Sequence, residues 1–405
     1  RRPAGPEGAI FDEGRRTAIA RTTDFEKERK KYARRKTIKR LLAVTLLTAA
    51  GVVLYAMRFE IASQGIGVLL SDFAATIVDN TGYPIPIESQ PLQLTAVGKR
   101  SALITESTLT VCNTAGNRVI EERMEGKNAI AVSAGRYLLT YLRGGYELWL
   151  RSGETVLFYQ RFDRPIYTAA LAPNGAVAVS TTAVGDQAQV TVYDSSSEEC
   201  FVWMSSGRII HSLALNDEAT GLAVGGVEFS GGVLSSFFSV FEISEGTAQA
   251  RCEVLLEGEL LLSMALREND MTTVVTDRAV HSIAANGSRR GTYSYEEKPL
   301  TAFALDEERG VLLAIGDYAS SHSLDLVRLD AEVRERAAGS CDRGILSLHF
   351  YGDEALAFTG ERALRYDASL KRAGSTETPD AVLCTVVGNQ LYYATMSELC
   401  RAQIR

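Results

Sequence analysis

The sequence has little of what marks a catalytic site. Only 4 of its 405 residues are histidine, and none has another metal-ligating residue at a spacing typical of metal sites. There is no Gly-x-Ser-x-Gly elbow, no phosphate-binding loop and no dinucleotide fingerprint. His211 and His349 fall within strand-like stretches, where we expect hydrogen-bonded structural roles. We therefore predict no catalytic residue, no metal and no cofactor, and a protein that is not an enzyme.

Long apolar runs are absent except for one, residues 41–57. As a helix it would span about 25 Å, enough to cross a membrane when Arg40 and Arg58 at its ends reach the headgroups. A soluble helix would carry polar residues at helical spacing, and a cleaved signal peptide would need a short basic leader and small residues at a cleavage site. Neither pattern is present. We predict an uncleaved signal-anchor helix over residues 37–60.

Charge is divided unevenly along the chain. Residues 1–40 hold 14 Lys and Arg against 6 Asp and Glu, whereas the whole chain holds 43 against 50. The net charge is therefore +8 for this segment and −15 for residues 41–405. By the positive-inside rule the basic segment stays in the cytoplasm, and this explains it without a nucleic-acid or acidic-lipid site. We predict a disordered basic cytoplasmic tail over residues 1–36, a single-pass membrane protein with its remainder extracytoplasmic, and no nucleic-acid partner.

The predicted external part repeats one phrase, in which an apolar pair, a short polar turn and a second apolar run follow each other. There are eight copies: LTAVGKRSALIT, IAVSAGRYLLTY, AALAPNGAVAVS, LALNDEATGLAVG, MALRENDMTTVVT, FALDEERGVLLAIG, LHFYGDEALAFTG and TVVGNQLYYAT. Equivalent positions are 35 to 51 residues apart, and further strand-like runs follow most copies. Four short strands per unit of about 40 residues is typical of β-propeller blades. We predict an all-β, eight-bladed propeller over residues 82–405, or a seven-bladed one if the first or last copy is something else.

The last copy has only three strand-like runs before Arg405, so its outer strand must come from elsewhere. The stretch GYPIPIES, residues 82–89, is extended and apolar and has two prolines, which an edge strand tolerates. We predict that it pairs as the outer strand of the last blade and closes the ring. Residues 61–81 carry apolar residues at helical spacing, and we predict a linker with a short helix there.

Closely spaced cysteines are also absent. The 6 cysteines include no adjacent or Cys-x-x-Cys pair. Four fall in separate repeats, while Cys384 and Cys400 fall on the first and third strands of the last one. Strands two steps apart in a sheet lie about 10 Å from each other, too far for a disulfide to form easily. We expect mostly buried free thiols.

The order of a basic tail, one apolar helix, the GYPIPI stretch and a degenerate propeller resembles an uncharacterised family of membrane-anchored β-propellers from Gram-positive, clostridial bacteria. This family lies within the WD40-like and quinoprotein-like group. The resemblance covers nearly the whole chain, although only GYPIPI is motif-like and the Trp-Asp dipeptide of WD40 repeats is missing. It implies a fold and an anchor but no activity.

Two stretches are candidates for binding, because propellers recognise partners through the loops of one face. The longer is a glycine-rich insertion with Phe229, Val233 and Leu234, which either clasps a partner or forms a long hairpin packed on its own blade. The second stretch contains Tyr318 and His322.

These observations predict a non-catalytic scaffold or sensor that binds an envelope protein or glycan at the membrane. The alternative is a propeller enzyme such as a quinone-dependent dehydrogenase or a glycosidase. Such an enzyme needs cofactor-binding side chains or two facing carboxylates, and the eight degenerate repeats reveal neither.

Overall fold

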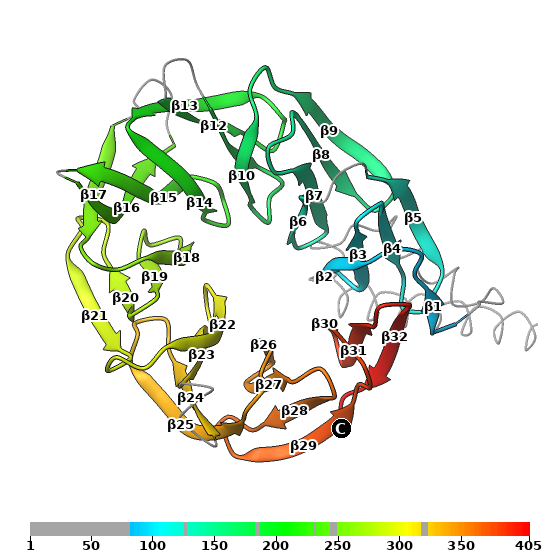
Figure 1. Cartoon of the computed structure of the whole chain (residues 1–405). Coiled ribbons are helices and arrows are strands. Elements are labelled where there is room, and N and C mark those ends of the chain that lie inside the picture. Colours follow the sequence, from blue (N-terminus) through cyan, green and yellow to red (C-terminus); the bar gives the residue numbers. More distant parts are fainter. Residues whose placement is uncertain (1–81, 125–127, 183–186, 231, 244–248, 317–322) are drawn as a thin grey trace, which may run out of the picture. The chain divides into compact units, whose positions relative to one another are not determined.

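The computed structural model describes the propeller part of the chain, residues 82–405. Five short segments in this range are not described: residues 125–127, 183–186, 231, 244–248 and 317–322. The described residues form 32 strands in eight separate four-stranded antiparallel sheets, arranged as blades around a ring (Figure 1). The predicted eight-bladed propeller is confirmed, and the seven-bladed alternative is wrong.

The predicted tail, anchor helix and linker, residues 1–81, lie outside the described residues. Within the part that is described, no helix has the length and apolar character needed to cross a membrane.

In seven blades the strands follow chain order, from the centre of the ring to its rim (Figure 1). Blade 1 comprises β2 (Pro91–Val97), β3 (Arg100–Thr105), β4 (Thr108–Cys112) and β5 (Arg118–Arg123). Blade 2 comprises β6 (Ala129–Ala134), β7 (Tyr137–Leu142), β8 (Glu147–Ser152) and β9 (Thr155–Arg161). Blade 3 comprises β10 (Ile166–Leu171), β11 (Val177–Thr182), β12 (Gln187–Tyr193) and β13 (Glu199–Ser206). Blade 4 comprises β14 (Arg208–Leu215), β15 (Gly221–Ser230), β16 (Val233–Glu242) and β17 (Ala250–Leu256).

The remaining blades repeat the arrangement. Blade 5 comprises β18 (Leu261–Leu266), β19 (Thr272–Thr276), β20 (Ala279–Ile283) and β21 (Arg289–Ser294). Blade 6 comprises β22 (Leu300–Asp306), β23 (Gly310–Ile315), β24 (Ser323–Leu329) and β25 (Glu335–Asp342). Blade 7 comprises β26 (Ser347–Tyr351), β27 (Glu354–Phe358), β28 (Arg362–Tyr366) and β29 (Arg372–Glu377). Blade 8 comprises β30 (Leu383–Val387), β31 (Gln390–Ala394), β32 (Glu398–Gln403) and β1 (Ile85–Pro86).

Blade 8 joins the two ends of the described chain. β1 pairs antiparallel with β32, with Ile85 opposite Leu399. Just before β1, the ring of Tyr83 packs edge-on against Tyr392, with 5.4 Å between the ring centroids. The prolines are tolerated because β1 is the outermost strand and needs no donor on its free edge. The predicted closure by residues 82–89 is confirmed.

Each central strand contributes side chains to two cores, because successive residues of a strand point to opposite faces. In β11, Val177 and Val179 pack with Leu148 of blade 2, whereas Ala178 packs with Leu222 of blade 4. β11 is buried at every position but its last and lacks the alternation of a half-exposed sheet. The cores between blades thus bind the ring together.

The turns between third and fourth strands share one chemistry in four blades. In each, a side-chain Oδ1 accepts the backbone N–H groups two and four residues later, as at Asn113, Asp194, Asp330 and Asp367. Such Asx turns tolerate a left-handed residue inside the turn. The residue three positions after the Asn or Asp has a positive φ in all four: Gly116, Ser197, Val333 and Leu370.

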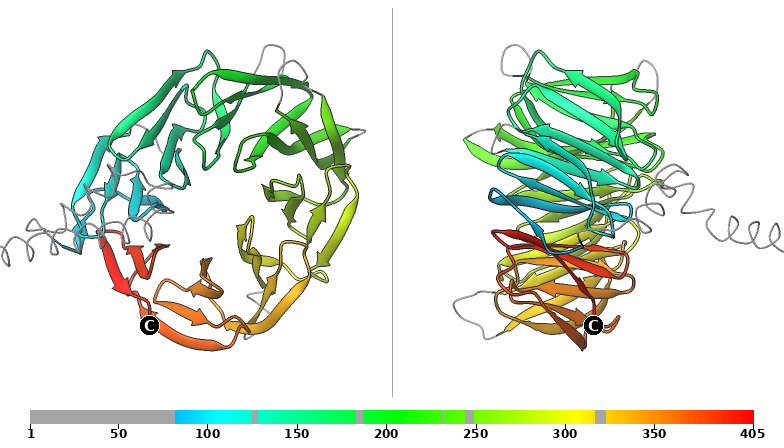
Figure 2. Two further views of the ribbon diagram at one scale, coloured as in Figure 1. Left: turned by 180° about the vertical axis from the view of Figure 1, so that it is seen from behind. Right: turned by 90° about the vertical axis from the view of Figure 1, so that its right-hand side faces the viewer.

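The ring has two faces, seen from behind and edge-on in Figure 2. We call one the turn face, because it carries the turns from first to second and from third to fourth strands. We call the other the connection face, because it carries the links between blades and the turns from second to third strands. Gly82, the first described residue, lies against Gly116 on the turn face. The chain therefore enters the propeller from that face.

Candidate functional site

The glycine-rich insertion of blade 4 is a β-hairpin. β15 and β16 pair without interruption up to Ser230 opposite Val233. The flanking strands end earlier, since β14 pairs with β15 only as far as Glu228 and β17 pairs with β16 only from Ser236. The hairpin thus projects beyond its own blade on the connection face. Of the two forms that the sequence left open for this insertion, the backbone has that of a long hairpin.

The glycines that suggested a loop instead allow close packing. A Cβ atom on Gly226 would overlap with the backbone carbonyl of Ile209 in β14, where the pairing of β14 and β15 is irregular. A Cβ atom on Gly225 would lie 3.1 Å from the side chain of Leu261 in blade 5. Glycine inside a strand commonly marks such a close approach.

Two of the five predicted binding residues meet at the tip of this hairpin. Phe229 and Leu234 are cross-strand partners, and they are 73% and 48% exposed. Neither packs into the blade, which the alternative of a packed hairpin required. The side chain of Val233 and both Tyr318 and His322 lie outside the described residues.

Further exposed apolar side chains gather on the connection face. Of the fifteen large ones in the described part of the chain, all but Val156, Leu157 and Tyr159 lie at or near strand ends on this face. Five of those on blades 3 to 5, together with Phe229 and Leu234, are called the apolar patch: Met204, Ile209, Leu255, Leu260 and Leu262. The sequence did not single these residues out, because they continue ordinary apolar strands.

Arg208 anchors the base of the hairpin. Its guanidinium lies 2.8 Å from the Oε2 atom of Glu228 in β15 and 2.5 Å from the Oε1 atom of Glu253 in β17. It also lies 4.2 Å from the ring centroid of Phe237. The hydrogen bonds with Glu253 raise the pKa of Arg208, and Arg208 in turn lowers the pKa of Glu253. Charge-assisted bonds of this kind hold three strands in register below the patch.

A carboxyl group with a raised pKa, Glu307, lies on the turn face beside a central cavity. A cavity of about 500 Å³ at the centre is lined by the first strands of blades 2 to 6 and by residues of the turns that follow two of them, β14 and β22. Burial, together with the charges of Asp217, Asp306 and Glu268, raises the pKa of Glu307 to about 7.

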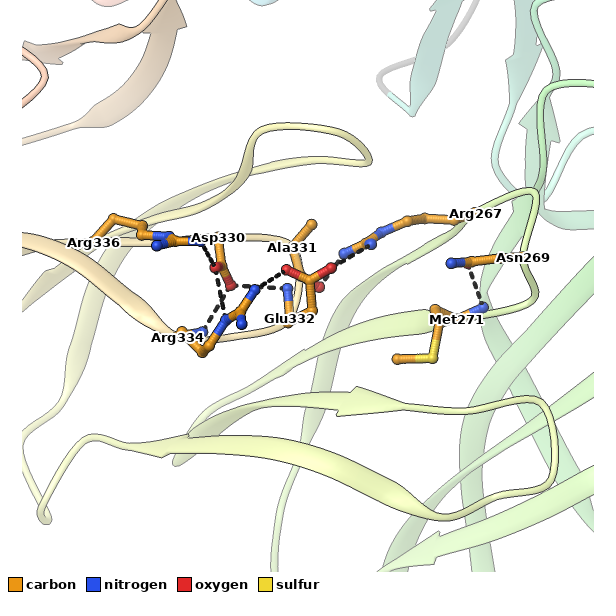
Figure 3. A network of polar contacts seen from close by, with 8 residues as sticks. All are labelled: Arg267, Asn269, Met271, Asp330, Ala331, Glu332, Arg334 and Arg336. Atoms are coloured by element: carbon orange, nitrogen blue, oxygen red, sulfur yellow. Dashed lines mark hydrogen bonds and ion pairs between the residues drawn. The ribbon is translucent and has the colours of Figure 1, made fainter.

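Other charged groups on the turn face bind neighbouring turns together (Figure 3). Arg267 of blade 5 donates to the carbonyl of Ala331 in blade 6, and its Nη1 atom lies 3.6 Å from Glu332. Within blade 6, Arg334 forms an ion pair of 3.0 Å with Asp330. These groups are paired with each other, which indicates a structural role.

The histidines and cysteines of the described region are also structural. His349 lies 2.9 Å from the Oγ atom of Ser347 and 3.2 Å from the Sγ atom of Cys384, and burial lowers the pKa of His349 to about 4. His211 lies in β14, as the sequence indicated. We expected a hydrogen-bonded role for it, but its buried Nε2 atom has no hydrogen-bond partner among the described residues. All 6 cysteines are free, and four are buried. No three His, Cys, Asp or Glu side chains in the described region are placed to hold a metal ion.

The fold is similar to solved propellers of low sequence identity. The C-terminal WD40 domain of Sif2 has a TM-score of 0.57 at 11% identity, covering 81% of this chain and 100% of that one. BamB from Moraxella catarrhalis has a TM-score of 0.52 at 12% identity, covering 80% and 97%. Chaetomium thermophilum Sqt1, solved bound to the N-terminus of ribosomal protein L10, has a TM-score of 0.54 at 11% identity, covering 80% and 100%. At these identities the likeness shows the fold alone.

Sequence comparison adds a family. No match was found among the curated proteins. A family model described as a family of unknown function, DUF5711, matches residues 77–399, which include nearly all of the propeller. The chain therefore belongs to the DUF5711 family.

Proposed function

We propose that this protein is a non-catalytic scaffold, anchored in a membrane, whose propeller binds an envelope protein outside the cytoplasm. The observation that carries the proposal is the apolar patch around Phe229 and Leu234 on the connection face. Exposed apolar side chains that gather on one face are unfavourable in water and typically mark an interaction site. The fold lends support, since Sqt1 was solved bound to a segment of a ribosomal protein.

Placement at a membrane is supported by the sequence. Residues 41–57 are an apolar run next to a basic segment, and the net charge changes from +8 before residue 41 to −15 after it. The resemblance to anchored propellers of Gram-positive bacteria agrees with this placement. Gly82, the first described residue, lies on the turn face, whereas the apolar patch lies on the connection face.

A propeller enzyme is the second candidate, and Glu307 is the observation that favours it. A carboxyl group with a pKa of about 7 beside a cavity is typical of catalytic acids. Thermal-shift measurements with pyrroloquinoline quinone and Ca²⁺ test the dehydrogenase form of this candidate, because a bound cofactor would raise the melting temperature.

Site-specific photo-crosslinking tests the scaffold. A photoreactive residue at Phe229 should yield a defined cross-linked protein in native membranes. A matched residue at Asn389, in a turn of blade 8 on the opposite face, should not. Replacing Ile209, Phe229 and Leu234 with Ser should abolish binding while changing stability by no more than about 1 kcal/mol, as is usual for surface positions. Equal cross-linking from both faces, or binding unaffected by the triple substitution, would contradict the proposal.

Topology is tested separately. Protease added to intact protoplasts should digest the propeller and spare residues 1–36. A propeller that survives until the cells are lysed would reverse the proposed orientation.

A further inference from the structure

A second pocket lies far from the apolar patch, between blades 1 and 2. It has a volume of about 380 Å³ and is lined by β4 and β5 of blade 1 and by β7 and β8 of blade 2. Leu109, Met124 and Leu142 supply apolar walls, and Glu122 and Trp149 add a carboxylate and an indole. A concave, mostly apolar site with a few convergent polar groups is the usual form of a small-molecule site.

The indole of Trp149 lines this pocket, with a second aromatic ring beside it. Leu148 and Leu150 point into the core between blades 2 and 3, so Trp149, between them in β8, points toward blade 1. The indole packs against the ring of Tyr159 in β9, at 5.6 Å between centroids and an angle of 38°. Neither ring is buried, and Tyr159 is one of the few exposed aromatic side chains away from the connection face. Trp149 thus offers an aromatic ring to a ligand in the pocket, and Tyr159 packs beside it.

Charged groups beside the rings are held in place. Arg151 is only 5% exposed and bonds Glu122 across the blade interface through both terminal nitrogens, at 2.8 and 2.6 Å. Its buried Nε–H has no acceptor among the described residues. On the other side of Trp149, the carboxylate of Glu147 accepts from the hydroxyl of Tyr159 at 2.9 Å. Donors and acceptors therefore surround the aromatic surface in fixed positions.

The charge balance selects the class of ligand. Glu122 is neutralised by Arg151, and Glu147 lies 3.1 Å from the guanidinium of Arg161. A cationic ligand would have to displace one of these arginines, and an anion would have to compete with a carboxylate for Arg151. A neutral ligand leaves both ion pairs, Arg151 with Glu122 and Arg161 with Glu147, intact. A sugar ring combines a C–H face that packs on an aromatic ring with hydroxyl groups that both donate and accept hydrogen bonds.

We propose that the pocket between blades 1 and 2 binds a neutral saccharide, with one sugar ring packed on Trp149 and its hydroxyl groups bonded to Glu122 and Glu147. Identifying the ligand as an envelope polysaccharide rests on the proposed extracytoplasmic placement, whereas saccharide binding itself rests on the pocket. The site and the apolar patch lie on different blades, so each can fail without the other.

Tryptophan fluorescence reports on this site directly, because the chain has 2 tryptophans. The other, Trp203, packs against Phe241 between blades 3 and 4, with 5.0 Å between ring centroids. The full-length protein carrying Trp203→Phe in detergent is titrated with chitotriose, cellotriose and maltotriose, and with trilysine as a cationic probe. At least one trisaccharide should change the emission saturably below about 10 mM, a weak but measurable affinity. No response to any trisaccharide, or a response to trilysine alone, would overturn the proposal.

Three variants test whether the saccharide binds at this pocket. Measured by calorimetry, Trp149→Ala should weaken the best trisaccharide by about tenfold or more, because the packed ring is lost, and Trp149→Phe should weaken it less. Glu147→Ala, at a surface position that leaves the fold intact, should weaken it several-fold in the fluorescence assay. Unchanged affinity in these variants would overturn the proposal. Cross-linking from Phe229 should persist in Trp149→Ala, which separates a failed saccharide site from a failed scaffold.

Discussion

Replacing Glu307 with Gln should remove a pH-dependent part of the propeller's stability. Glu307 lies in the turn between β22 and β23, where burial and neighbouring carboxylates raise its pKa to about 7 from 4.5. Gln has the shape of protonated Glu, but it cannot ionise. The substitution therefore changes the titration with little change in packing.

The direction follows from proton binding. Between pH 4.5 and 7 the folded parent holds a proton at Glu307 that the unfolded chain has released, so its free energy of unfolding falls as pH rises. This contribution is complete below pH 4.5 and is lost as pH passes 7. A pKa difference of this size corresponds to at most ~3 kcal/mol. Because Glu307 is partly exposed, we expect solvent screening to leave about 1–3 kcal/mol.

Urea denaturation of the parent and Glu307→Gln at several pH values between 4.5 and 8 measures this difference. Other titrating groups contribute equally to both proteins and cancel. Relative to the parent, the variant should gain stability steadily across the interval. Glu308→Gln is a matched control, since Glu308 is adjacent but exposed, and it should follow the parent. Parallel pH profiles for the parent and Glu307→Gln would refute the reasoning.

Three further predictions, on two substituted positions and one deletion, test the fold. Gly226→Ala should cost ~3 kcal/mol in a thermal or urea melt, because its Cβ would overlap with the carbonyl of Ile209 and β14 would have to move; a variant as stable as the parent would contradict the close approach. Deleting residues 82–89 should lower the melting temperature by several degrees through the loss of the closing strand; an unchanged melt would show that closure contributes nothing. Arg208→Ala should cost about 2–3 kcal/mol and Arg208→Lys less, because Ala leaves two carboxylates without their partner; equal losses would argue against the paired geometry.

Much of the fold could be predicted because its signals are local. Each blade repeats apolar strands with polar turns, and this period is readable without knowing any distant contact. The two prolines before Ile87 marked an edge strand for the same local reason. The form of the insertion in blade 4 stayed open, because Gly225 and Gly226 signal either a loop or close packing, and only the position of β14 distinguishes these.

The candidate site was predicted in part. Phe229 and Leu234 were chosen because a long insertion with large apolar residues is unusual, and they are exposed as expected. Ile209 and Leu260 were missed, because an apolar residue at the end of a strand gives no sign of whether a neighbouring blade covers it. That depends on how far each strand extends past the next.

The sequence by itself determined the eight repeats, the outer strand contributed from the other end of the chain, and the charge asymmetry, since each of these resides in the order of residues along the chain. Only the tertiary structure decided that Arg151 meets Glu122, 29 positions away, beside Trp149, and that the charge of Asp217 in blade 4 raises the pKa of Glu307 in blade 6. Such contacts depend on the stagger between blades and on the curvature of the closed ring. Both are set by packing between sheets. The alternation of side chains along a strand, with a period of two residues, carries no information about that packing.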